Sequence, residues 1–250
     1  MEPRVVVVTG GGTGIGKATA GTFAADGDRV VIVGRRVAVL DHAADEIRRA
    51  VPLANVVVQQ CDVTSVDQVV ALADWLRQTV GQVHVLVNNA GGGGSGSSAG
   101  NLAGIAEQAR AVLDGNLLGS YLVIRGLQGL LARPGARIVN VSSVAAFRGG
   151  GDIYSAAKAG VVGLTYALAN EFGPNGITVN AVAPGLVLDT EFFGDAMTPE
   201  RVQRIVAQTP VARPGRPDDI AAAIHYLASP NASFVTGEVL HVNGGWVFGR

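Results

Sequence analysis

Short runs of consecutive apolar, mostly β-branched residues recur along the chain and alternate with longer segments of helical period. Seven runs predict strands, at Val5–Val8, Val30–Val33, Val56–Val58, Val83–Val87, Ile138–Val141, Ile177–Val182 and Val239–Val242. Six segments predict helices, at 15–26, 37–50, 65–79, 102–132 (broken near Asp114-Gly115), 152–172 and 217–228. Uninterrupted apolar runs are typical of strands covered on both faces. The alternation therefore predicts an α/β fold, a doubly wound parallel sheet with helices on both faces.

Composition narrows the class of protein. The 250 residues are 48% hydrophobic and 16% charged, which excludes a disordered chain. No linker interrupts the pattern, so residues 1–250 are expected to form a single domain, with GGGGSGSSAG at Gly91–Gly100 as a mobile loop. The net charge of −1 gives no basic footprint for nucleic acid or an anionic membrane. With one cysteine, no signal-peptide pattern and no apolar stretch near the roughly 18 residues of a membrane span, a cytoplasmic protein is expected.

The first predicted strand runs into a glycine-rich turn, Thr9–Gly16 (TGGGTGIG), followed directly by a predicted helix. Glycines at 10, 14 and 16 would allow a tight turn, the approach of a pyrophosphate and close helix–strand packing. The helix N-terminus would then face the anion with unpaired N–H groups. The motif predicts dinucleotide binding on a Rossmann-type sheet; the alternative is an ordinary glycine-rich connection.

The second predicted strand ends in Gly34-Arg35-Arg36, with no acidic residue before Asp41. At this position an acid accepts hydrogen bonds from the ribose of NAD, whereas an arginine accommodates the 2′-phosphate of NADP. NADP(H) is therefore favoured over NAD(H) as the cofactor. The alternative is that Arg35 and Arg36 only lead into the next helix in solvent.

Tyr154 and Lys158 are four residues apart, which places both on one face of a helix. A neighbouring ammonium lowers the pKa of a phenol and lets it exchange a proton with a carbonyl or alcohol oxygen. Chance pairs are common, but Lys17 and Lys158 are the only lysines of the chain. A lysine in so arginine-rich a sequence points to a task that arginine does not perform, such as bonding ribose hydroxyls.

The strand at Ile138–Val141 ends in Ser142-Ser143, at the carboxyl edge where open α/β sheets bind ligands. A hydroxyl there would hydrogen-bond a developing alkoxide. Taken alone, Ser143 is better explained as a turn residue that closes a strand.

Together these motifs resemble those of the short-chain dehydrogenase/reductase superfamily, and they occur in its order over essentially the whole chain. The sequence is similar to the group that includes 3-oxoacyl-carrier-protein reductases and related ketoreductases. The matching positions are Thr9–Gly16, Asn88-Asn89-Ala90-Gly91, Asn116, Ser143, Tyr154, Lys158, Pro184-Gly185, Thr236-Gly237 and Asn243-Gly244-Gly245.

The resemblance implies a role for each matching residue. Tyr154 would be the general acid in reduction and the base in oxidation, and Lys158 would lower its pKa and bind the nicotinamide ribose. Ser143 would orient the carbonyl, and Asn116 would hold a water in a proton relay. The implied cofactor-binding set is Gly10, Thr13, Gly14, Ile15, Gly16, Arg35, Arg36, Asp62, Val63, Asn89, Ala90, Gly91, Tyr154, Lys158, Pro184, Gly185 and Val187.

Three features bear on this assignment. Enoyl reductases of the superfamily space their tyrosine and lysine more widely, which favours carbonyl chemistry. The eleven positions from Ser143 to Tyr154 are fewer than usual, so Ser142 remains an alternative to Ser143. Thr190, a candidate carboxamide or phosphate contact, lies one residue later than in the family pattern, which puts its role in doubt.

The segment at about 186–213 has no strand period and is where the family keeps its substrate lid. Phe192, Phe193 and Met197 lie in it, and Phe147 is a further candidate wall, which indicates an apolar or aromatic carbonyl or alcohol substrate. The alternative is that they only pack the lid. A carrier protein is a possible but not favoured partner, with Arg125, Arg133, Arg137 and Arg148 as candidate contacts.

The resemblance also implies a homotetramer, formed through the helices at 116–132 and 152–172 and a second interface near Gly244-Gly245-Trp246. The four histidines have no ligand spacing, so no metal is expected. The main functional prediction is an NADPH-dependent ketoreductase. The alternatives are an NAD(P)+-dependent alcohol or sugar-alcohol dehydrogenase and a non-catalytic dinucleotide sensor, which would commonly have lost the tyrosine or the lysine.

Overall fold

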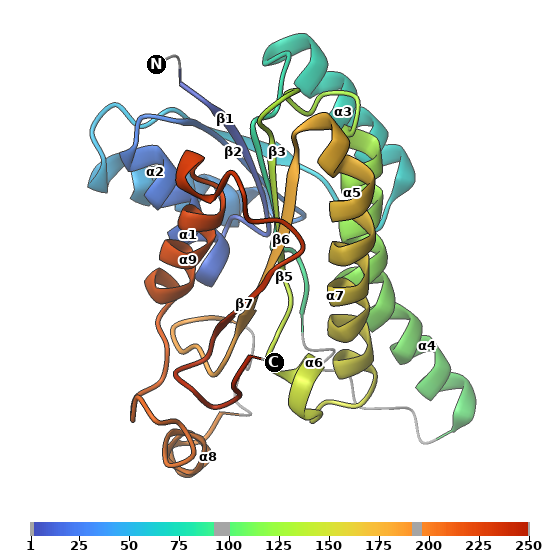
Figure 1. Cartoon of the computed structure of the whole chain (residues 1–250), viewed down its shortest axis with the longest axis vertical. Coiled ribbons are helices and arrows are strands. Elements are labelled where there is room, and N and C mark those ends of the chain that lie inside the picture. The colour runs from blue at the N-terminus through green and yellow to red at the C-terminus, as the bar shows by residue number, and fades with distance from the viewer. Residues whose placement is uncertain (1–2, 93–100, 192–196, 250) are drawn as a thin grey trace.

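The computed structural model describes residues 3–92, 101–191 and 197–249. It contains one seven-stranded parallel sheet with the strand order β3-β2-β1-β4-β5-β6-β7 (Figure 1). The strands are β1 Val5–Thr9, β2 Arg29–Gly34, β3 Val56–Gln60, β4 Val85–Asn88, β5 Arg137–Val141, β6 Thr178–Pro184 and β7 Val239–Val242. The predicted doubly wound α/β fold is confirmed, because helices cover both faces of this sheet.

Figure 1 shows the helices as two layers. One layer holds α1 Gly14–Ala25, α2 Val37–Ala50 and α9 Pro217–Leu227; the other holds α3 Val66–Thr79, α4 Leu102–Leu113, α5 Gly119–Leu127 and α7 Ile153–Phe172. Two short helices, α6 Ala145–Arg148 and α8 Pro199–Val206, lie near the lower edge of the sheet in this view. None of the helices in the described part of the chain is long and apolar enough to cross a membrane.

Alternate residues of the central strands enter two separate hydrophobic cores. Val7 and Leu86 pack with α3, α5 and α7, whereas Val6, Val8 and Val87 pack with α1, α2 and α9. Burial on both faces explains why these strands are apolar at every position. The pairing of Thr9 with both Val33 and Asn88 aligns the carboxyl ends of the three strands at the centre of the sheet.

The prediction that the helix over 102–132 breaks near Asp114-Gly115 is wrong. The helix does not break at Asp114 but continues through a π-helical turn, Asp114–Leu118, into α5. The side-chain amide of Asn116 donates to the carbonyl of Val112 at 2.9 Å, which supplies a partner to the backbone within the wider turn. The helix ends at Leu127, and Leu131 forms a bridge to Val83 instead.

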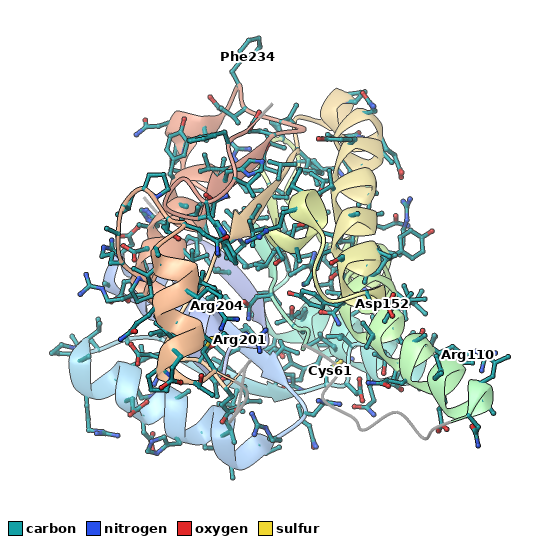
Figure 2. The ribbon with its side chains drawn as sticks, turned by 90° about the horizontal axis from the view of Figure 1, so that it is seen from below. Cys61, Arg110, Asp152, Arg201, Arg204 and Phe234 are labelled. Carbon is teal, nitrogen blue, oxygen red and sulfur yellow. The ribbon has the colours of Figure 1, made fainter. Side chains whose placement is uncertain are left out.

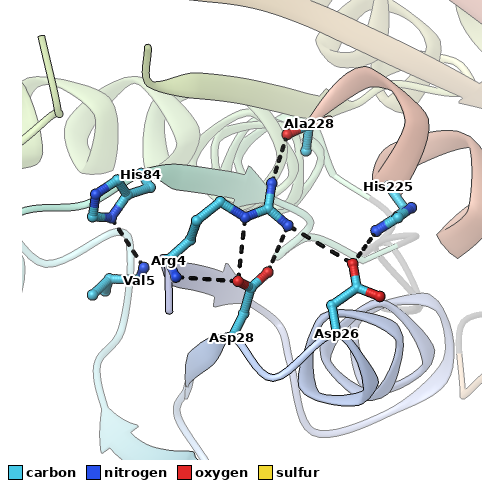
Figure 3. Close-up of polar contacts among 7 residues, drawn as sticks. All are labelled: Arg4, Val5, Asp26, Asp28, His84, His225 and Ala228. Carbon is cyan, nitrogen blue, oxygen red and sulfur yellow. Dashed lines mark hydrogen bonds and ion pairs between the residues drawn. The ribbon is translucent and has the colours of Figure 1, made fainter. Parts of the chain in front are cut away.

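A cluster of charged side chains lies at the amino end of β1 (Figure 3). This edge of the sheet is opposite to the carboxyl ends of the strands. Arg4 donates to the buried carboxylate of Asp28 through Nε and Nη2, at 3.2 and 2.6 Å, and to the carbonyl of Ala228 at 3.0 Å. Asp26 lies 3.9 Å from Arg4 Nη2 and 2.6 Å from Nε2 of His225. These contacts join the start of β1, the α1–β2 turn and the end of α9.

Asp28→Asn should lower the free energy of unfolding by about 1.5–3 kcal/mol, because it removes the charge that pairs with Arg4 in a buried position. Asp45 is a control, since its ion pair with Arg48 is on the exposed surface of α2. Asp45→Asn should cost no more than about 0.5 kcal/mol. Urea denaturation of both variants measures the difference, and equal midpoints would contradict the importance of this cluster.

Candidate active site

A cavity of about 950 Å³ lies along the carboxyl edge of the sheet, where β1 is flanked by β2 on one side and β4 on the other. After β1 the chain passes to the helix layer on one face of the sheet, and after β4 it passes to the layer on the other face. Open α/β sheets bind their ligands at such a switch point. Figure 2 looks onto this edge from below, with α8 and its Arg201 and Arg204 on one side and Asp152, before α7, on the other. Residues at the ends of β2, β3, β5 and β6 all border the cavity, so it extends across the sheet between these strands.

The turn between β1 and α1 brings bare backbone to the cavity. Gly10 and Gly14 have positive φ angles of 65° and 48°, which glycine adopts without strain. A Cβ on Gly16 would lie 2.1 Å from the carbonyl oxygen of Gly10, so α1 approaches β1 this closely only with glycine there. Thr13 makes no side-chain capping hydrogen bond at the start of α1. The first N–H groups of the helix thus border a space that suits an anion.

The segment after β4 supports this turn from the other side. Thr9 Oγ1 accepts hydrogen bonds from the backbone N–H groups of Asn89 and Ala90, each at 3.0 Å. The side-chain amide of Asn89 donates to the carbonyls of Thr9 and Gly10, each at 3.1 Å. A Cβ on Gly10 would lie 2.8 Å from that amide nitrogen. The two strand ends are locked together, and the cavity wall between them is made of glycine and small residues.

The ends of β2 and β3 form one end of the cavity. Arg35 and Arg36 both border it, together with Asp62 after β3. Burial acts to raise the pKa of Asp62, but hydrogen bonds from Thr64 and the charge of Arg35 outweigh it and lower the pKa. Arg36 Nη2 lies 2.5 Å from Oε2 of Glu191, a residue that follows β6. Arg36 is therefore paired with a carboxylate, and Arg35 is close enough to Asp62 to affect its charge.

At the other end, Asn116 and Lys158 meet beside Gly91. A Cβ on Gly91 would lie 2.6 Å from Asn116 Oδ1 and 3.4 Å from Lys158 Nζ. Asn116 also exchanges hydrogen bonds with the backbone of Gly92, at 2.9 and 3.2 Å. Lys158 is buried; its Nζ donates to the carbonyl of Val141 at 2.9 Å and lies 5.7 Å from the ring centre of Tyr154.

The structure separates the two adjacent serines by their partners. The hydroxyl of Ser142 is buried and donates to the backbone carbonyl of Lys158 at 2.9 Å, which fastens the end of β5 to α7. Ser143 is less buried; its Oγ accepts the N–H of Ala145 at 3.1 Å and hydrogen-bonds Tyr154. Ser143 is therefore the serine whose hydroxyl lies beside the phenol.

Burial controls the protonation of the tyrosine and the lysine. It raises the pKa of Tyr154 to about 12, although the hydrogen bond with Ser143 acts in the opposite direction. The expected lowering of this pKa is therefore not seen, because the cost of removing a phenolate from water is larger. Burial also lowers the pKa of Lys158 to about 8. At neutral pH the pair is a protonated phenol beside a cation that is close to titrating.

All the residues that the sequence assigns to catalysis or cofactor binding border this one cavity, except Gly16, which packs beneath the turn. The sequence analysis missed Glu191, which has no motif, and Thr64, whose N–H and hydroxyl donate to Asp62 in an Asx turn that the order Asp-Val-Thr signals. It also missed the wall that Val39, Leu40 and Cys61 form. Burial raises the pKa of the Cys61 thiol to about 11, so it is neutral.

The segment expected to form the lid contains the helix α8 in its described part. Thr190 borders the cavity, and a Cβ on Gly14 would lie 2.9 Å from its methyl group. Thr198 caps α8 by accepting from the N–H of Arg201 at 3.3 Å. Phe192 and Phe193 lie outside the described residues, as do residues 93–100 of the glycine-rich loop. Phe147 packs its ring on that of His241, with the centres 4.4 Å apart.

These features fit a dinucleotide. The glycine turn supplies free space and N–H groups for a pyrophosphate, the arginines border one end, and polar groups gather at the other. No group of three or more possible metal ligands occurs within the described ranges. The fold and cavity thus define an α/β protein of the dinucleotide-binding class.

Comparison with known proteins identifies the family. A family model described as enoyl-(acyl carrier protein) reductase matches residues 10–247. The chain is 38% identical to a 3-oxoacyl-[acyl-carrier-protein] reductase of Synechocystis sp., covering 99% of this chain and 98% of the relative. It is 34% identical to a 7alpha-hydroxysteroid dehydrogenase of Escherichia coli, covering 99% and 95%. An actinorhodin polyketide ketoreductase crystallised with NADPH superposes with a TM-score of 0.86 at 35% identity, covering 98% and 97%.

The chain therefore belongs to the short-chain dehydrogenase/reductase superfamily. It is an oxidoreductase that acts on CH–OH and C=O groups with a nicotinamide dinucleotide. One relative is longer: the chain spans 44% of an uncharacterized short-chain type dehydrogenase/reductase of Sinorhizobium fredii, at 38% identity.

Proposed function

We propose that this protein is an NADPH-dependent ketoreductase that reduces a free, apolar or aromatic ketone. The observation that carries the proposal is the placement of Tyr154, Ser143 and Lys158 at one end of a cavity whose other end is bordered by Arg35 and Arg36. A protonated phenol is a suitable acid for a carbonyl oxygen, and two arginines favour the 2′-phosphate of NADP(H).

The dinucleotide, when bound, supplies the hydride that the carbonyl carbon accepts. The hydroxyl of Ser143 would donate a hydrogen bond to the carbonyl oxygen and orient it beside Tyr154. The phenol of Tyr154 would give its proton to that oxygen as negative charge develops. The ammonium of Lys158 would stabilise the phenolate that results, since an opposite charge nearby favours the charged form.

The proton of Tyr154 must be restored after each turnover. Lys158 and Asn116 lie together beside Gly91, and the amide oxygen of Asn116 accepts only one weak hydrogen bond among the described residues, at 3.2 Å from the N–H of Gly92. We assign Asn116 to hold a water at this oxygen. Lys158 would return a proton to the Tyr154 phenolate and take one up from solvent through this water. The π-helical turn supports this role, because it directs the side chain of Asn116 toward Gly92 rather than away from the cavity.

A free ketone is favoured over a carrier-bound substrate by the state of the candidate arginines. Arg125 pairs with both carboxylate oxygens of Glu171, and Arg148 stacks on the ring of Trp246 at 4.0 Å. Arg133 and Arg137 donate to backbone carbonyls, and Arg137 starts β5 at the edge opposite the cavity. None of the four is therefore left without an internal partner.

The first test follows absorbance at 340 nm with NADPH or NADH and a panel of aromatic, aliphatic and β-keto thioester ketones. Tyr154→Phe should lower the rate of ketone reduction about 10²–10⁴-fold, because it removes the acid, while leaving the dissociation constant for NADPH within about twofold. Loss of NADPH binding in the variant would assign the tyrosine to binding instead. NADH preference would favour the alcohol dehydrogenase, and binding without turnover of any ketone would favour the sensor.

The pH profile tests Lys158. Its ammonium is charged below its pKa of about 8 and is lost as the pH rises through that value, whereas Tyr154 stays protonated to about pH 12. We therefore expect kcat/KM for reduction to fall above pH 8. Lys158→Arg does not titrate in this range, so its lower activity should lack that alkaline fall. A fall that persists in Lys158→Arg would assign the titration to another group.

We also propose that the protein is a homotetramer that uses the outer faces of α5 and α7. Tyr121 and Tyr166 are exposed there, as is Leu118 just before α5. Light scattering should give about four times the 25.5 kDa of one chain. Tyr166→Glu should reduce that mass, whereas Val70→Glu, at an exposed apolar position on α3, should not. A wild-type mass of one chain would refute the proposal.

A further inference from the structure

We propose that Glu191 is a specificity-determining residue: it holds Arg36 and thereby weakens the binding of a 2′-phosphate, so that it limits the preference for NADP(H) over NAD(H). The inference rests on the proposed function, in which Arg36 faces that phosphate. It starts from one contact, the 2.5 Å ion pair between Arg36 Nη2 and Glu191 Oε2, which joins residues 155 positions apart in the sequence.

The backbone on both sides of this contact is well supported. Arg36 is the N-cap residue of α2, directly after β2. On the other side, Leu188 donates to the carbonyl of Gly215 at 3.1 Å, and Gly215 donates to that of Leu186 at 2.8 Å. Asp189 then turns with a φ of 60°, and Thr190 packs on Gly14 of the glycine turn. The segment after β6 thus passes beside the glycine turn and places the carboxylate of Glu191 next to Arg36.

The charges at this end of the cavity are nearly balanced. Arg36 forms an ion pair with Glu191, and the charge of Arg35 acts on Asp62 without an ion pair between them. Lys17, in the first turn of α1, is paired with Glu46 at 2.8 Å. An incoming 2′-phosphate would therefore meet Arg36 already paired, whereas Arg35 forms no ion pair within the described residues. The arginine that would accept it is already bound to a competing oxyanion.

A 2′-phosphate carries nearly two negative charges and forms strong hydrogen bonds with a guanidinium, so it competes with Glu191 for the same donors. It is also repelled by the carboxylate if that group stays near. NADH has only hydroxyls at this place and does not need the guanidinium to be released. Both effects act on NADPH alone, and removal of the charge of Glu191 should change the ratio of the two affinities.

The experiment uses binding, without turnover. Isothermal titration calorimetry of the full chain with adenosine 2′,5′-bisphosphate and with adenosine 5′-monophosphate isolates the effect of one phosphate. NADPH and NADH follow with fluorescence detection. Glu191→Gln should tighten binding of adenosine 2′,5′-bisphosphate and NADPH about fivefold at low salt, as expected for an exposed ion pair, and change that of the other two by less than about twofold. The gain should shrink at high salt.

Two controls identify the route. Glu107→Gln removes the same charge from another residue that borders the cavity, on α4, and should leave the affinity ratio unchanged within about twofold. In an Arg36→Met background, Glu191→Gln should lose most of its effect, because the competition acts through Arg36. An equal gain from Glu107→Gln would mean that only overall charge matters, which would overturn the proposal.

The outcomes also separate this inference from the proposed function. If Arg36→Met weakens adenosine 2′,5′-bisphosphate selectively but Glu191→Gln changes nothing, Glu191 has no role in specificity while the cofactor assignment stands. If Arg36→Met affects both nucleotides equally, the assignment of NADPH itself fails. A gain from Glu191→Gln that persists in full in the Arg36→Met background would replace competition with direct repulsion and overturn the proposal as stated.

Discussion

The close contact between the start of α1 and the end of β1 is the constraint on which the rest of the site depends. A Cβ at Gly16 would lie only 2.1 Å from the carbonyl oxygen of Gly10, so the helix comes this close only because no side chain intervenes. The contact directs the N-terminus of α1 at the cavity and leaves Thr9 and Gly10 free to bond Asn89. Through these bonds the geometry of β1 is passed to β4, and the segment after β4 carries Gly91 to Asn116 and Lys158.

A second set of buried polar groups links the sheet to α7, which carries the proposed acid. Asn88 donates to Asn140 at 2.9 Å, and Asn140 donates to Thr165 at 3.0 Å, all within the core. Ser142 adds a bond from the end of β5 to the backbone of Lys158. Buried hydrogen bonds are costly to leave unmade, so they fix the position of α7 along the sheet more sharply than apolar packing does. The position of Tyr154 relative to Ser143 follows from that alignment.

The periodic parts of the fold could be predicted from the sequence, because strands buried on both faces and amphipathic helices have distinct patterns. Two local features and one long-range contact escaped prediction. The π-helical turn at Asp114–Leu118 appears as a break in the pattern because a single inserted residue shifts the helical period. The helix α8 follows the capping pair Thr198-Pro199, a start signal that carries little weight without an apolar stripe to bury. Sequence motifs predicted the cavity residues near the strand ends. Glu191 could not be predicted in this way, because its contact with Arg36 joins residues 155 positions apart and no local pattern indicates it.

Lys158 shows how stability and chemistry oppose each other in this site. Burial lowers its pKa from 10.5 to about 8, which means that holding the ammonium inside costs the folded state roughly 3 kcal/mol at neutral pH. A neutral side chain of similar length would avoid that cost, and an arginine would stay charged but present its donors in a wider fork. One of the two lysines of the sequence is nevertheless at this position. In the proposed mechanism, a compact cation with a pKa close to neutrality both stabilises a phenolate and passes on a proton, and this combination would account for a lysine in a place that otherwise disfavours charge.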